Sequence, residues 1–85
     1  MKEFFGGTGM KLSVIRAGGV CTVIGVDGEI RFRRHMYDMG ITPGVKITVK
    51  RVAPFGDPML ISLRGYSLIM RKSEAQLITV KPVAV

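Results

Sequence analysis

Tryptophan is absent from this sequence, and cysteine and histidine occur once each, as Cys21 and His35. A single cysteine can form no disulfide within the chain and cannot build a zinc cage from cysteine ligands. The single histidine has no serine or cysteine in a catalytic arrangement near it, and no paired acidic motif accompanies it. The nucleotide-hydrolysis motif GxxxxGK(S/T) is also absent. These absences indicate a binding protein rather than an enzyme.

Long apolar runs are missing as well. No run approaches the ~20 residues that a membrane-spanning helix requires, and residues 1–7 contain no apolar core of signal-peptide length. The single cysteine fits a reducing compartment. We therefore expect a cytoplasmic protein that does not span a membrane.

Acidic residues are scarce, with 6 Asp and Glu against 13 Lys and Arg and a net charge of +7. Such a balance suits nucleic acid, an anionic membrane surface or an acidic protein. Proteins that bind single strands usually place aromatic residues between basic ones on a sheet face. The strand expected at residues 45–53 offers Lys46, Thr48 and Lys50 but no aromatic residue. Nucleic acid is therefore disfavoured, and a small basic RNA-binding barrel stays as an alternative.

The residues that are abundant are apolar, at 47% of the 85 residues. A single domain of this size hides only roughly 60–65% of its unfolded surface, so its core is thin. Either the core is unusually dense in aliphatic side chains, or part of the apolar surface stays exposed for a partner.

The clearest local signal is a helix that stops sharply and turns into a strand. Phe32, Met36 and Met39 fall at i, i+4 and i+7, which predicts one apolar face of a helix over residues 29–39. Gly40 can adopt the left-handed conformation that ends a helix, and Pro43 forbids its continuation.

The remaining patterns predict about five short strands, at residues 20–26, 45–53, 59–63, 67–71 and 78–81. A turn or a single helical turn is expected within residues 11–16, and a one-turn helix at 73–77 with Ser73 as its cap. We expect a flexible N-terminus over 1–10, one domain over 11–82 and a tail over 83–85. Strands this short are best arranged as a small, partly open barrel with the helix at one end.

Four segments of the chain, at residues 38–44, 53–58, 63–68 and 71–75, resemble the ferrous iron transport protein A (FeoA) family. They read Asp-Met-Gly-Ile-Thr-Pro-Gly, Ala-Pro-Phe-Gly-Asp-Pro, Leu-Arg-Gly-Tyr-Ser-Leu and Arg-Lys-Ser-Glu-Ala. The resemblance covers residues 12–81. Any one segment alone is a weak signal, but the four in this order are specific.

The resemblance implies a mainly β, SH3-like barrel that serves ferrous iron uptake as a cytoplasmic accessory. It also implies that the chain binds and regulates the membrane iron transporter FeoB, whose cytoplasmic part is a GTP-binding region. A similar fold forms the C-terminal domain of iron-dependent repressors, so an SH3-like metal-responsive regulatory domain is the alternative. A homodimer and a monomer both stay open.

The family's frequent description as transition-metal binding directs attention to possible ligands. His35 and Asp38 are i, i+3 on the expected helix and could approach one ion, and Cys21, Glu29 and the Met residues are further candidates. A tight divalent site usually takes three or four protein ligands. We therefore expect that Fe2+ or Zn2+ binds weakly, if at all, to the monomer or is shared across a dimer, with Cys21 a buried apolar side chain.

The candidate partner-binding residues are mostly aromatic or apolar residues near turns. Tyr37, Met39, Phe55 and Tyr66 are expected at one end of the barrel, where SH3-like domains bind extended partners. Phe55 lies in a loop bounded by prolines and is either an exposed anchor or a plug of the barrel mouth. Tyr66 is expected to pack across its hairpin.

Arg34 completes the set of candidate partner-binding residues, and two other charged residues have different expected roles. Arg34 is expected to contact an acidic partner surface and could act on a partner's GTPase in trans, whereas Arg31 is expected to be solvated. Asp57 is expected to cap its own turn rather than to contact a partner.

Overall fold

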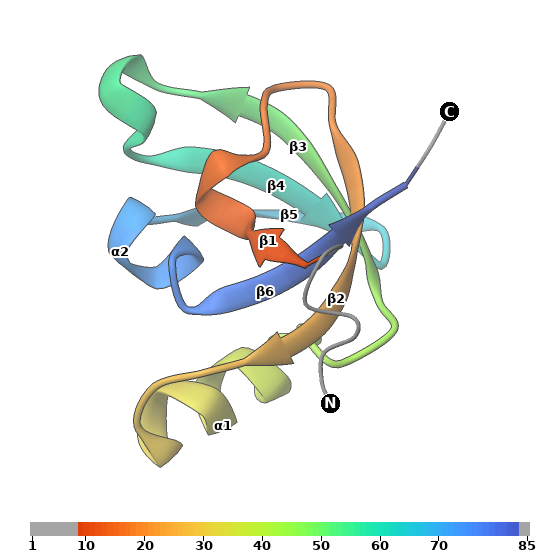
Figure 1. Ribbon diagram of the computed structural model, residues 1–85, viewed down its shortest axis with the longest axis vertical. Coiled ribbons are helices and arrows are strands. Elements are labelled where there is room, and N and C mark those ends of the chain that lie inside the picture. The colour runs from red at the N-terminus through yellow and green to blue at the C-terminus, as the bar shows by residue number, and fades with distance from the viewer. Residues whose placement is uncertain (1–8, 84–85) are drawn as a thin grey trace.

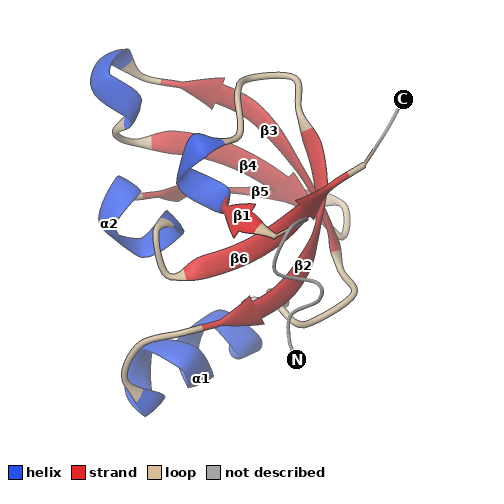
Figure 2. Ribbon diagram, viewed as in Figure 1, coloured by secondary structure: helices blue, strands red, loops and turns tan. Residues whose placement is uncertain are grey.

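The computed structural model describes residues 9–83, which form one six-stranded antiparallel sheet with short helices at its margins (Figures 1 and 2). The strands are β1 (Met10–Lys11), β2 (Val20–Val26), β3 (Lys46–Val52), β4 (Met59–Leu63), β5 (Tyr66–Met70) and β6 (Ile78–Pro82). The helical elements are the 3-10 turns η2 (Leu12–Val14) and η3 (Pro54–Gly56) and the α-helices α1 (Ile30–Asp38) and α2 (Lys72–Ala75).

The strands follow the order β1-β6-β2-β3-β4-β5. Among the described strands β1 and β5 are the two edges, so hydrogen bonds between these six strands do not close the barrel. The register shifts between Val23 and Gly25 on β2 and between Val49 and Arg51 on β3. Such bulges increase the local twist of a sheet and help it to curve around a small core.

The core is built from alternating residues of the strands. On β4, Met59, Ile61 and Leu63 are buried, while the residues between them are partly exposed. β3 contributes Ile47 and Val49 in the same way. None of the described residues is a buried polar or charged one. The period-two pattern of the sequence therefore places the apolar side chains of these strands on one buried face, as predicted.

The predicted helix is present, with Glu29 preceding it and Met39 ending it. Met36 is buried, and Phe32 and Met39 are partly buried, so the expected apolar face is the one that packs. The structure places α1 at one end of the long axis of the molecule, beyond β2 (Figure 1). Its remaining residues face solvent.

The sequence-based elements differ from the structure in a few places. Six strands are present where about five were expected, because Met10 and Lys11 pair with Val80 and Thr79. Two paired residues carry too little pattern to be recognised. The expected flexible N-terminus and tail lie, except for residues 9, 10 and 83, outside the described part of the chain.

Some element boundaries in the structure also differ by one or two residues from those expected from the sequence. β5 begins at Tyr66, since the turn consists of Arg64 and Gly65. α2 begins at Lys72, so Ser73 lies inside this helix and is not its cap. β6 includes Pro82, which pairs with Cys21 at the end of the strand, a place where a proline costs no ladder hydrogen bond.

Candidate protein-binding surfaces

The C-terminal end of α1 has a well-defined termination. Gly40 has a φ of 95°, the left-handed conformation predicted for it. Its N–H donates to the carbonyl of Tyr37 at 2.9 Å, and the N–H of Ile41 donates to the carbonyl of Met36 at 2.9 Å. This pair of hydrogen bonds is the Schellman motif. Because Ile41 and Met36 are both buried, the motif also fixes the end of the helix to the core.

The β4–β5 hairpin supports the same helix end from outside. The Tyr66 hydroxyl donates to the carbonyl oxygen of Met39, and Arg64 Nε donates to the carbonyl oxygen of Gly40 at 3.3 Å. The Met39 carbonyl has no partner within the helix, whereas the Gly40 carbonyl also accepts from the N–H of Thr42 at 3.1 Å. A guanidinium suits the negative end of the helix dipole. The hairpin therefore sets the position of α1 relative to the sheet.

Arg64 is a residue that the sequence reasoning missed. Its φ is 49° and that of Gly65 is 87°, so both turn residues have the positive φ of a type I′ hairpin turn. Sequence singles out the glycine of such a turn but not the arginine before it. The two-residue spacing between the apolar patterns of residues 59–63 and 66–70 was the available signal.

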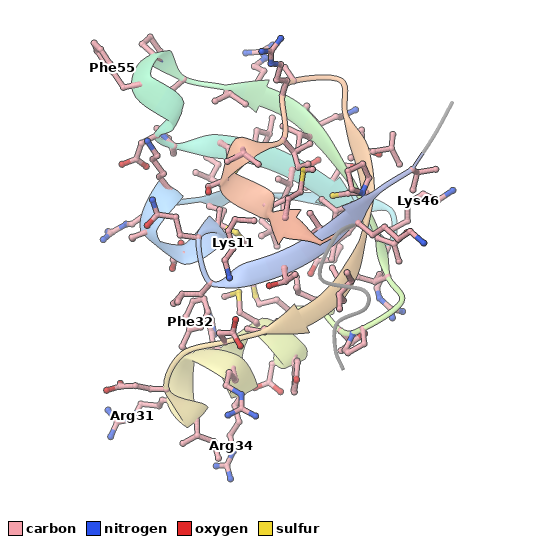
Figure 3. All side chains as sticks on the ribbon, in the orientation of Figure 1. Lys11, Arg31, Phe32, Arg34, Lys46 and Phe55 are labelled. Atoms are coloured by element: carbon pink, nitrogen blue, oxygen red, sulfur yellow. The ribbon has the colours of Figure 1, made fainter. Side chains whose placement is uncertain are left out.

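Two of the predicted partner residues are available at the surface of α1. The Arg34 side chain projects away from the sheet, as does that of Arg31 (Figure 3), and Tyr37 is 41% exposed. Met39 is partly buried, and its carbonyl accepts the Tyr66 hydrogen bond. Tyr66 itself bonds to the helix rather than only packing across its hairpin.

Phe55 lies at the other end of the molecule, so the expectation of one shared cluster was wrong. It precedes β4, whereas Tyr66 pairs with Leu63 at the far end of that strand. The length of β4, roughly 13 Å at about 3.3 Å per residue, separates them. Figure 3 shows Phe55 projecting outward, opposite the end that carries Arg34. With 95% of its surface exposed, it does not plug the barrel.

The loop that carries Phe55 is tied to α2. Asp57 Oδ1 accepts a hydrogen bond from the N–H of Lys72 at 3.1 Å. It therefore caps this neighbouring helix, whereas the sequence had suggested that it caps its own turn. Glu74 Oε1 accepts from the N–H of Arg71 at 2.9 Å. Carboxylates at a helix start satisfy free N–H groups and suit the dipole. Phe55 adopts a φ of 67° in this loop, which is unusual for a residue with a side chain.

The candidate metal ligands do not converge. His35 and Asp38 are exposed on α1, and Glu29 is exposed just before it. Cys21 is fully buried on β2, its Sγ donating to the carbonyl of Ile47 at 3.7 Å, and burial raises the pKa of its thiol to about 11. Within residues 9–83, no three His, Cys, Asp or Glu side chains are grouped to hold an ion. These residues do not fit a tight transition-metal site.

Comparison with known proteins identifies the family of this chain. A protein-family model described as the FeoA domain matches residues 10–82. The chain belongs to the FeoA family. It is also 31% identical over 75 residues to an Fe(2+) transport protein A/Fe(2+) transporter FeoB fusion protein of Porphyromonas gingivalis. That match covers 88% of this chain but only 9% of the fusion protein. FeoA domains are thus associated with ferrous iron transport.

Solved structures agree with the family and the fold. A FeoA-like protein from Clostridium acetobutylicum superposes with a TM-score of 0.83 at 41% identity, over 92% of this chain and 91% of that one. FeoA of Stenotrophomonas maltophilia, solved in complex with zinc and described as an SH3 domain protein, gives a TM-score of 0.75 at 22% identity. This match covers 85% and 89% of the two chains. The prediction of a mainly β, SH3-like fold is confirmed.

Among the described residues, no helix has the length and apolar character needed to cross a membrane.

Proposed function

We propose that this FeoA protein is a cytoplasmic accessory of ferrous iron uptake that binds the cytoplasmic GTP-binding region of FeoB and regulates the transporter. The observation that carries the proposal is the fusion of the two proteins in the P. gingivalis relative. Domains joined in one chain in one organism commonly act together as separate chains in another. The absence of a catalytic motif from the sequence fits a protein that works by contact.

The exposed face of α1 is the proposed contact. Arg31, Arg33 and Arg34 are exposed there beside the half-exposed ring of Tyr37. Arginine and tyrosine are enriched at the centres of protein interfaces because they combine large contact area with directed hydrogen bonds. The hairpin contacts at Met39 and Gly40 hold this face in a fixed orientation. A rigid surface loses little conformational entropy on binding.

Titration of the protein with the purified GTP-binding region of FeoB tests the proposal. We expect binding that weakens on the order of tenfold in Arg34→Glu, since each 1.4 kcal/mol changes an affinity tenfold, and weakens further with salt. Arg16→Glu is the matched control. It makes the same charge change in an exposed loop separated from α1 by β2, roughly 20 Å long at about 3.3 Å per residue.

Absence of binding by the wild-type protein, by calorimetry and by co-purification, would refute the proposed partnership. Equal losses in Arg34→Glu and Arg16→Glu would keep the partner but remove α1 as the contact. A GTPase assay with and without this protein separates regulation from simple assembly. Sedimentation of the free protein distinguishes a monomer from a homodimer.

A further inference from the structure

A shallow apolar groove lies at the end of the molecule opposite α1. It has a volume of about 280 Å³ and runs beside β3, β4 and β5 next to the η3 loop. Its described lining includes the apolar residues Val52, Pro58, Leu60 and Ile69, together with one charged residue, Arg51. We refer to it as the β5 groove.

The groove is bordered by apolar side chains that remain in water. Ile69 is 71% exposed on β5 and pairs with Leu60 on β4, which in turn pairs with Arg51 on β3. Phe55 stands in the adjacent loop, almost fully exposed (Figure 3). Large apolar side chains gathered at a hollow of the surface are typical of an interaction site.

The strand beside the groove is an edge. β5 ends the strand order, so one side of its backbone has no partner strand within the described residues. Its sequence, Tyr-Ser-Leu-Ile-Met, contains no charged residue and no proline. Edge strands usually carry such residues because they prevent pairing with another chain. An unprotected edge next to an apolar groove suits an extended segment that adds as a further strand.

The charged residues around the groove indicate which kind of partner it can bind. Arg51 lies in the lining, and Lys50, Arg71 and Lys72 are exposed nearby in sequence on β3 and at the end of β5. The carboxylates of this region, Asp57 and Glu74, are engaged by backbone N–H groups at the start of α2. The rim is therefore positive. A second copy of the chain would bring its own net charge of +7 to the same rim, which disfavours a dimer here.

We propose that the β5 groove binds an extended acidic segment of a partner protein. The segment pairs with the free edge of β5, places bulky apolar side chains on Ile69 and against Phe55 at the groove, and directs its carboxylates toward Arg51 and Lys72. This site is separate from the α1 face, and the inference does not depend on the proposed FeoB contact.

The probe for the test is a short fluorescein-labelled peptide in which Glu alternates with Leu or Phe. We expect the full-length protein to bind it and the amides of β5 to show the largest NMR shift changes. Ile69→Lys should weaken binding by about tenfold or more, as loss of an anchor does. Ile30→Lys is the control, because Ile30 is a 63% exposed isoleucine on α1 at the other end of the molecule.

Any of three outcomes would overturn the proposal. Wild type and Ile69→Lys could bind the peptide equally well, or the NMR shift changes could fall on α1 instead of β5. The protein could also bind a peptide with Lys in place of Glu as tightly as the acidic one. A wild-type dimer that Ile69→Lys converts to a monomer would identify a second copy as the occupant. A short single-stranded RNA that binds with the same dependence on Ile69 would identify nucleic acid. Failure of the FeoB titration with retained peptide binding would leave this inference intact and remove only the proposed function.

Discussion

Tyr66, the first residue of β5, donates a hydrogen bond from its hydroxyl to the carbonyl oxygen of Met39, the residue that ends α1. The two residues are 27 positions apart in the chain. The bond links the hairpin to the helix and, together with the bond from Arg64 to Gly40, explains why α1 holds one orientation although only Met36 of its residues is buried.

Tyr66→Phe removes this link without removing the ring. We expect the free energy of unfolding to fall by about 1 kcal/mol, the usual net value of one hydrogen bond. Amide exchange at the end of α1 should also become faster. Urea unfolding and hydrogen exchange measure the two effects. Tyr37→Phe is the matched control, since Tyr37 is equally exposed at 41%. Equal effects of the two substitutions would contradict a specific role for the Tyr66 hydroxyl.

Gly40→Ala tests how closely the hairpin approaches the helix end. A Cβ at Gly40 would lie 3.1 Å from Arg64 Cδ, on a backbone with φ of 95°. Gly44 has nearly the same φ, 94°, but no contacting atom of the described residues lies within 4 Å of its Cβ position. Gly44→Ala should therefore cost only the conformational strain, about 1–2 kcal/mol. We expect Gly40→Ala to cost more in thermal unfolding, and equal losses would show that Arg64 moves aside freely.

Asp57→Ala removes the acceptor for the N–H of Lys72. Loss of a capping side chain typically costs about 1 kcal/mol, and we expect that decrease in the free energy of unfolding. Asp38→Ala serves as the control: its exposed carboxylate lies at the C-terminal end of α1, where a negative charge opposes the dipole. Its removal should be neutral or slightly stabilising. A neutral Asp57→Ala in urea unfolding would show that water replaces the cap.

Because the Cys21 thiol is buried, we expect the protein to lose stability in alkaline solution. Burial raises the pKa of its thiol from 9.0 to about 11 in the folded state. The unfolded chain therefore releases this proton at lower pH than the folded chain does. The stabilisation is complete below pH 9 and is lost as pH rises toward about 11, and a two-unit shift corresponds to at most about 3 kcal/mol.

Urea unfolding across this pH range measures the effect. Other groups, including tyrosine and lysine, titrate in the same region, so the comparison is with Cys21→Ala, whose lower stability should vary less steeply with pH. The same pH dependence in both proteins would show that the buried thiol contributes nothing.

The order of the elements could be predicted because it depends on local patterns. Alternating apolar residues at 59–63 and 78–81, the apolar face of residues 29–39 and the helix stop at Gly40 each act over a few neighbouring residues. Four short segments were enough for the family, since they lie in the same order and spacing. The burial of Cys21 was also expected, as a free cysteine behaves as a small apolar residue.

Which residues share a surface depended on how the strands pair. Phe55 and Tyr66 are both aromatic residues at turns, yet β4 runs between them and puts them at opposite ends, and no local pattern carries that register. Asp57 and Lys72 are 15 residues apart and meet only after η3 and α2 pack together. The hydrophobic pattern specifies which side chains avoid water, whereas long-range hydrogen bonds and edge positions arise only when distant segments of the chain are brought together.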